Sequence, residues 1–192
     1  TTADNAVTNA KAAVTNQETE NKALANALKT AETAQGTAQT NVNNKQTAVQ
    51  KAEDEVGHKE ADVTAKQTAL DTAVSNRSAK EADVETAKKA KADADLDVTK
   101  AEEELRVLEN TPVGDAEYQQ ALTKYNNALQ AQSDAQTALN EAHDRLGQAD
   151  EEVLEAQSKL NSAQSERDTA NEAYINALME LDRANTALTT AK

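Results

Sequence analysis

The sequence predicts an all-α fold, a long antiparallel two-helix coiled-coil hairpin with a single turn near residues 109–116. Three observations predict it. A seven-residue apolar repeat runs through most of the chain. The only proline lies in the only strong helix-breaking segment. Alanine dominates the apolar residues, while Phe, Trp and Cys are absent. A compact core would need larger side chains, whereas alanine can fill a thin seam between two helices.

The composition also excludes several partners and sites. A net charge of −14 is unsuited to nucleic acid, because a binder needs a basic stripe to displace counterions from phosphates. No segment approaches the ~20 apolar residues of a membrane span, so we expect no membrane insertion. Without cysteine there are no disulfides, thiolate metal sites or thiol chemistry. We expect no bound cofactor.

The turn is predicted at residues 110–115, between a first arm ending at residue 109 and a second arm beginning at 116. Asn110 is expected to end the first helix in the left-handed conformation, and Pro112 pushes the preceding residue into an extended one. Asp115 is a favourable N-cap for the second helix, and Glu117 in its first turn suits the helix dipole.

The second arm has the clearest repeat. Every seventh residue from Ala121 to Ala191 is alanine, and we call these the d positions. The residues three before each alanine are mostly large and are called a positions: Tyr118, Tyr125, Gln132, Leu139, Leu146, Val153, Leu160, Arg167, Tyr174, Leu181 and Leu188.

The first arm, residues 35–109, follows the same rule. Its a positions are Val42, Val49, Val56, Val63, Leu70, Arg77, Val84, Lys91, Val98 and Leu105. Its d positions are mostly Ala or Lys, with Leu108 last. A seven-residue repeat sustained this long predicts a left-handed supercoil. Each arm would span roughly 110 Å at ~1.5 Å per residue.

The tight turn also predicts the register. With Leu108 opposite Tyr118, the numbers of facing residues add to about 226, and a large residue generally meets an alanine. The pairs include Val98 with Ala128, Val42 with Ala184, and the charged pairs Glu104 with Lys124 and Asp83 with Arg145. The register also brings Lys59 opposite Arg167 beside Gly57, so we expect bending or local opening there.

Residues 1–34 keep the same apolar frame but have no partner in this register. We expect them to form a helical overhang or continuation of the rod, and they are a candidate for self-association. Gly36 is an alternative hinge that would let them fold back.

Few side chains are candidates for a site. Val107, Val113 and Leu122 near the turn form a candidate contact point at the tip of the hairpin. Glu55 and His58 make one Glu-x-x-His, but a di-iron bundle needs a second such motif and two further Glu. We therefore predict no metal site, no catalytic residue and no enzyme activity.

Segments such as Val42-Asn43-Asn44-Lys45-Gln46-Thr47-Ala48-Val49 resemble the alanine-rich coiled-coil stalks of Gram-positive cell-wall-anchored surface proteins, of the adhesin or surface-exclusion type. The resemblance implies an extracellular, cell-wall-attached spacer that projects or itself forms an adhesive surface toward a protein or host-cell ligand. One alternative is an intracellular coiled-coil spacer or dimerisation arm. A minor one is a stress-related or ice-binding helix, because the spacing of Thr8, Thr19 and Thr30 is similar to that of alanine-rich antifreeze proteins.

Overall fold

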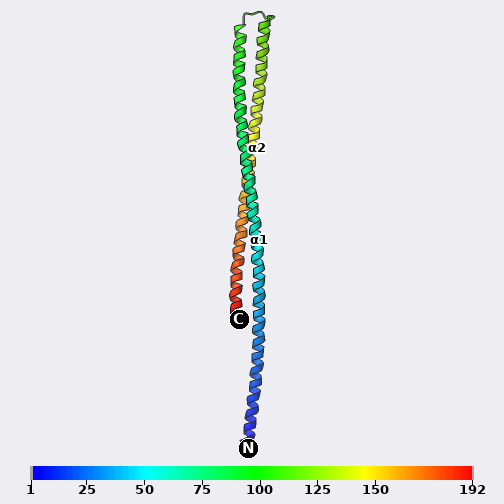
Figure 1. The fold of residues 1–192 in the computed structure, drawn as a ribbon, viewed down its shortest axis with the longest axis vertical. Helices are drawn as coiled ribbons and strands as arrows, with labels where there is room; N and C mark the ends of the chain where they lie inside the picture. The colour runs from blue at the N-terminus through cyan, green and yellow to red at the C-terminus, as the bar shows by residue number, and fades with distance from the viewer. Residues whose placement is uncertain (1, 192) are drawn as a thin grey trace. The chain divides into compact units, whose positions relative to one another are not determined.

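The computed structural model describes residues 2–191, nearly all of them in two helices. Helix α1 is Thr2–Val107 and helix α2 is Ala116–Thr190 (Figure 1). The helices pack against each other, and no strand occurs within residues 2–191. This confirms the predicted all-α helical hairpin. Neither helix has, within the described residues, a segment long and apolar enough to cross a membrane.

Threonine is abundant in both helices although it is a weak helix former. Its hydroxyl repeatedly donates a hydrogen bond to the carbonyl four residues earlier, as from Thr37 to Thr33 and from Thr86 to Ala82, both at 2.9 Å. Such bonds satisfy the hydroxyl within its own helix. The threonines are therefore compatible with helices whose stability comes from the packed seam.

The turn differs from its predicted form at the end of α1. The helix ends at Val107 rather than at residue 109, and the backbone N–H groups of Leu108, Glu109 and Thr111 each donate to the carbonyl three residues earlier. No residue of the described chain has a positive φ, so the left-handed conformation predicted for Asn110 is wrong. The last carbonyls of α1 therefore accept hydrogen bonds from a tightened turn, and no left-handed residue is needed to satisfy them.

The start of α2 is as predicted. The carboxylate of Asp115 accepts a hydrogen bond of 2.8 Å from the backbone N–H of Glu117, and its carbonyl accepts one of 3.0 Å from Gln119 N–H. These bonds satisfy N–H groups of the first turn, which have no partner within the helix. Asp115 is therefore the N-cap of α2.

The chain divides into two packing units. The first unit consists of the residues up to Ala61 together with those from Ser165 onward, and the second consists of Asp62–Gln164. In the first unit, Val42 packs with Ala184 and Leu188, and half-buried Ala38 and Leu181 complete the cluster. The numbers of Val42 and Ala184 add to 226, as predicted.

The second unit contains the turn, which joins the green end of α1 to the start of α2 (Figure 1). The two helices bond to each other at Glu104 with Lys124, 2.8 Å apart, and at Asp95 with Gln132, 2.7 Å apart. The first of these pairs was predicted from the register. The predicted pair of Asp83 with Arg145 is wrong. Their partners lie one turn away on their own helices, Lys80 at 3.2 Å and Glu141 at 3.6 Å, because intrahelical partners compete for exposed charges.

Burial follows the predicted repeat closely. From Ala38 to Ala191, every a and d position is buried or half-buried. All of the fully buried apolar residues are a or d positions: Val42, Ala73, Val84, Val98, Ala101, Ala121, Ala142, Ala149, Leu160, Ala163, Ala170, Ala184 and Leu188. Of these thirteen residues, eight are alanine. The core of each unit is therefore the thin seam of large and small side chains predicted from the sequence.

Two other expectations concern the glycines. Gly36, Gly57 and Gly147 all lie within unbroken helix, so the local opening predicted near residues 57–59 and the hinge at Gly36 are wrong. Each glycine has open space where a Cβ would lie. At Gly57 and Gly147 the cost of a glycine within a helix, about 1 kcal/mol against alanine, is too small to break a helix held by seam contacts on both sides.

Residues 2–37 continue α1 but are all exposed. The first half-buried residue is Ala38, which packs against the cluster of Val42 and Leu188. This agrees with the expectation that the residues before about 35 have no partner in the seam.

The pairing of large with small side chains can be tested at Val84 and Ala142, which are 3% and 2% exposed and face each other in this register. We expect Val84→Ala to lower the free energy of unfolding by about 1–2 kcal/mol, because it leaves a void. Ala142→Val should lower it by about 1–3 kcal/mol, because it overpacks the layer. Urea unfolding followed by circular dichroism measures both.

The double variant Val84→Ala/Ala142→Val exchanges the two side chains and keeps the volume of the layer. Its free energy of unfolding should fall by much less than the sum of the decreases caused by the two single substitutions. Strictly additive losses would show that the two residues do not share a layer.

Candidate functional site

The three predicted tip residues lie at or near the turn and differ in their exposure. Val107, the last residue of α1, is 73% exposed, and Val113, within the turn, is 66% exposed. Leu122 is half-buried beside the seam. A shallow groove at this end is lined by Val107, Leu108 and Ala121 together with polar residues, and neither Val113 nor Leu122 contributes to its walls. Of the three residues, the two valines are therefore the most exposed.

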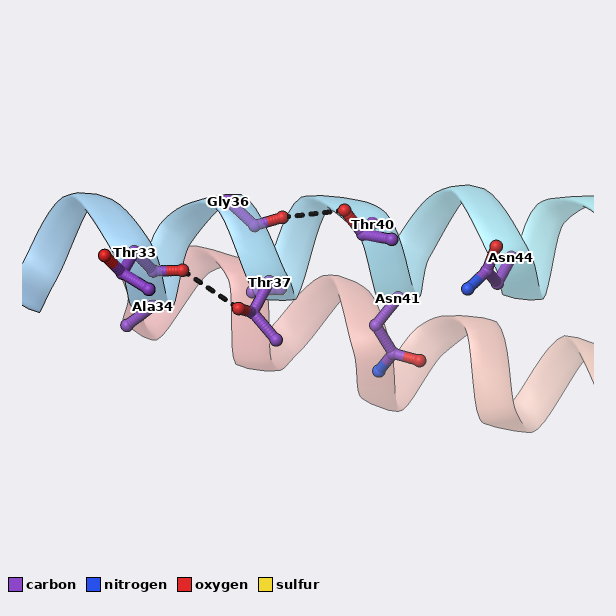
Figure 2. Close-up of a pocket in the computed structure, with 8 residues that line it drawn as sticks. Thr33, Ala34, Gly36, Thr37, Thr40, Asn41 and Asn44 are labelled. Carbon is purple, nitrogen blue, oxygen red and sulfur yellow. Dashed lines mark hydrogen bonds between the residues drawn. The ribbon is translucent and has the colours of Figure 1, made fainter.

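A second groove lies on α1 in the first unit (Figure 2). Its walls are formed by Thr33, Thr37, Thr40, Asn41, Asn44 and their small neighbours. The hydroxyls of Thr37 and Thr40 donate to the carbonyls of Thr33 and Gly36, at 2.9 and 3.0 Å. These hydroxyls are therefore occupied within the helix, and the groove offers chiefly the amide groups of its two asparagines.

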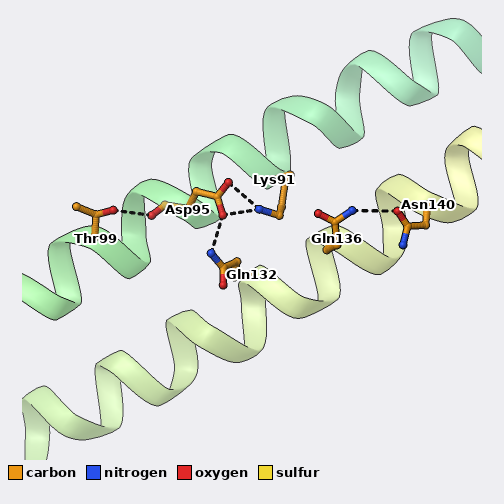
Figure 3. A network of polar contacts seen from close by, with 6 residues as sticks. All are labelled: Lys91, Asp95, Thr99, Gln132, Gln136 and Asn140. Atoms are coloured by element: carbon orange, nitrogen blue, oxygen red, sulfur yellow. Dashed lines mark hydrogen bonds and ion pairs between the residues drawn. The ribbon is translucent and has the colours of Figure 1, made fainter.

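A cluster of polar side chains lies at the seam of the second unit. Asp95 accepts hydrogen bonds from Lys91, at 2.5 and 2.7 Å, and from Gln132 on α2, at 2.7 Å (Figure 3). The bonds from Lys91 and then from Gln132 lower the pKa of Asp95 below its ordinary value. Lys91 and Gln132 occupy a positions of two neighbouring layers, opposite Ala135 and Ala94, so polar side chains replace the large apolar residue in both layers.

Arg77 forms a similar polar layer in the same unit. Its Nε donates to Asp150 on α2, and its Nη1 lies 2.8 Å from Glu81. The hydrogen bond to Asp150 is the main cause of the raised pKa of Arg77. The two side chains are 37% and 47% exposed, so water reaches this ion pair and screens it.

The first unit contains two lysines at d positions. Lys45 lies 2.5 Å from Glu180, and the hydrogen bond it donates lowers the pKa of Glu180. Lys59 lies 3.0 Å from Glu166 and 3.5 Å from Glu55. The bond to Glu166 raises the pKa of Lys59. Lys59 reaches outward to carboxylates while its stem lies along the seam.

Sequence reasoning missed the cross-helix pairs of Asp95, Asp150 and Glu180. A signal for them exists, because each of these acids lies immediately beside an a or d position. In the register of 226, that places each acid next to a polar a or d residue on the facing helix. Of the two charge pairs predicted from the register, Glu104 with Lys124 is confirmed and Asp83 with Arg145 is wrong.

No cluster of three or more His, Cys, Asp or Glu side chains within residues 2–191 could hold a metal ion. His58 and Glu55 lie one turn apart on α1, with Glu55 directed to Lys59. No buried side-chain polar atom within the described residues lacks a hydrogen-bond partner. The chemistry visible in the described residues is that of helix pairing.

Comparisons with known proteins found no matching family model, no matching curated protein and no matching solved structure. The functional argument therefore rests on the seam, its polar layers and the exposed faces of the helices.

The polar layer at Arg77 provides a test of what these layers contribute. The register places Arg77 opposite Ala149, which is 5% exposed. Arg77→Leu would form a large–small apolar layer and leave Asp150 hydrated. We expect Arg77→Leu to raise the urea midpoint of unfolding and Arg77→Ala to lower it. A lower midpoint for Arg77→Leu would mean that the ion pair stabilises this layer more than apolar packing does.

The acid pairs predict a dependence of stability on pH. The pKa values of Asp95 and Glu180 are lowered in the folded chain. Such carboxyls contribute stability above their unfolded pKa values, about 3.8 and 4.5, and lose it as the pH falls through their folded values. We therefore expect the urea midpoint to fall as the pH is lowered below 4.5. Asp95→Asn/Glu180→Gln should show a smaller fall than the wild type, and an equal fall would contradict the assignment.

Proposed function

We propose that this chain is a structural spacer of a bacterial cell-surface protein, either projecting another domain or presenting an adhesive surface of its own. The observation that supports this proposal best is the agreement between the repeat and burial. Every a and d position from Ala38 to Ala191 is withdrawn from solvent, and nearly every other position is exposed. From Ala38 onward, most of the large apolar residues therefore serve to hold the two helices together.

The charges support a spacer exposed to water. The acidic excess lies on positions outside the seam, where like charges oppose nonspecific association. The side chains at the seam that are not apolar are satisfied by partners on the same or the facing helix, as at Arg77 and Lys91. The absence of cysteine fits a pairing that needs no disulfide in any compartment.

The spacer is assigned to a cell surface because its heptad repeat is rich in alanine, threonine, asparagine and glutamine, a composition that resembles the stalks of Gram-positive surface proteins. In this proposal the ligand of the adhesive surface is a protein or a host-cell component. The exposed valines at the turn, Val107 and Val113, are the candidate contacts for such a ligand.

The main alternative is an intracellular arm that separates or pairs other domains. Both functions need the same seam, so only the location of the protein distinguishes them. Antibodies against residues 1–192 should label intact cells of the organism that encodes the chain. Brief protease treatment of intact cells should remove that signal, while a cytoplasmic marker survives as the control.

Labelling that appears only after the cells are permeabilised would contradict the surface assignment and support the intracellular arm. Loss of the cytoplasmic marker during protease treatment would show that the cells had lysed, and the treatment would be shortened until the marker is retained.

A further inference from the structure

The exposed start of α1 has an apolar face that the seam does not use. Val7, Val14, Leu24 and Leu28 are 54–68% exposed, although they occupy the same a and d frame as the buried Val42. Ala3 and Ala10 complete this N-terminal face. The face is continuous along one helix with an established helix–helix interface, because Ala38 on the same frame packs against α2. We propose that it pairs with the same face of a second copy of this chain, in antiparallel orientation.

One register of the two copies avoids a clash with α2 and also brings opposite charges together. It places Val7 opposite Leu24 of the second copy, and Thr2 opposite Lys29 of the second copy. The apolar layers are then Val7 with Leu24 and Ala3 with Leu28, and the more polar layers are Ala10 with Asn21 and Val14 with Gln17. Two-fold symmetry repeats each layer once. The outer layer of Ala3 with Leu28 has the large–small form of the seam.

Space excludes registers in which the two copies overlap more. Sliding the copies by one heptad would place Thr2 of the second copy opposite Gly36. The seam register already assigns that position to Thr190, the last residue of α2. A further heptad would place the second copy over Ala38, which is occupied by the cluster around Val42. The described N-terminal residues of the second copy therefore fit only alongside the part of α1 that precedes the seam.

Charge excludes the register with less overlap. Shortening the overlap by one heptad would bring Asp4 beside Glu18 of the second copy and Lys11 beside Lys11 of the second copy, at positions that flank the seam, and like charges there oppose pairing. In the favoured register Lys11 flanks Glu18 of the second copy, and this attractive pair occurs twice. Neither Lys11 nor Glu18 forms a salt bridge within the described residues. A parallel pair would place Lys11 opposite Ala6 and gain no such attraction.

This proposal goes beyond the spacer function and does not depend on the cell-surface assignment. Sedimentation equilibrium of the full 192-residue chain at low salt should show a concentration-dependent dimer. Leu24→Asp should raise the dissociation constant by about tenfold or more, because it removes an apolar residue from two layers of the dimer. Leu154→Asp is the matched control. Leu154 is exposed to a similar degree, 70% against 68%, but lies outside both faces.

A chain that remains monomeric at every concentration would overturn the proposal, and so would an equal loss of pairing in the two aspartate variants. Circular dichroism of each variant would confirm that helix content is kept. A stoichiometry above two would also contradict a two-fold pair.

The register is tested separately by exchanging charges. Lys11→Glu alone and Glu18→Lys alone should each raise the dissociation constant by about tenfold, because each replaces two attractive pairs with two repulsive ones. Mixing the two variants in equal amounts should restore pairing, since the carboxylate introduced at position 11 of one chain then meets the ammonium group introduced at position 18 of the other. Failure of the mixture to associate more tightly than either variant would exclude this register.

Discussion

The contact between a large side chain on one helix and an alanine on the other is the interaction on which this structure depends. Eight of the thirteen buried apolar residues are alanine, and none is aromatic. A single layer of this kind buries little area, so its contribution is a few kcal/mol at most before conformational entropy is subtracted. Only the repetition of layers in one unbroken register makes the helices stable. A slip of one heptad would keep the pattern of large and small residues but would require a different turn.

That dependence explains how much the sequence could predict. The frame of a and d positions, the position of the turn and the N-cap at Asp115 follow from periodicity and from the preferences of single residues. They agree with the burial and hydrogen bonds of the structure. The end of α1 was less predictable, because a tightened last turn and a left-handed Asn110 both satisfy the last carbonyls. Local opening at Gly57 was overestimated, because a helix braced by neighbouring layers tolerates one glycine.

The polar layers were harder to predict than the apolar ones. Asp83 and Arg145 satisfy the register but prefer partners one turn away, whereas Asp95 and Asp150 reach across the seam. Asp83 also lies immediately beside an a position, so the difference lies in the facing residue. Asp95 and Asp150 lie next to a polar seam residue of the facing helix, Gln132 or Arg77, which needs a partner because it is partly withdrawn from water, whereas the layer beside Asp83 is apolar. These polar layers bury less apolar surface than the others do. They also oppose pairing in the wrong register, as polar seam residues do in other coiled coils. Function is less visible still, because a spacer acts through geometry and leaves no cluster of reactive groups.

The most direct test of this account is disulfide formation, for which the cysteine-free sequence is well suited. The register places Val98 opposite Ala128, and residues facing each other in a seam this narrow can approach disulfide distance. Val98→Cys/Ala128→Cys should form an intramolecular disulfide rapidly under mild oxidation at low protein concentration. Val98→Cys/Ala135→Cys, displaced by one heptad, should not. Equal rates for the two variants, or a faster reaction in the displaced one, would contradict the register from which the large–small seam was derived.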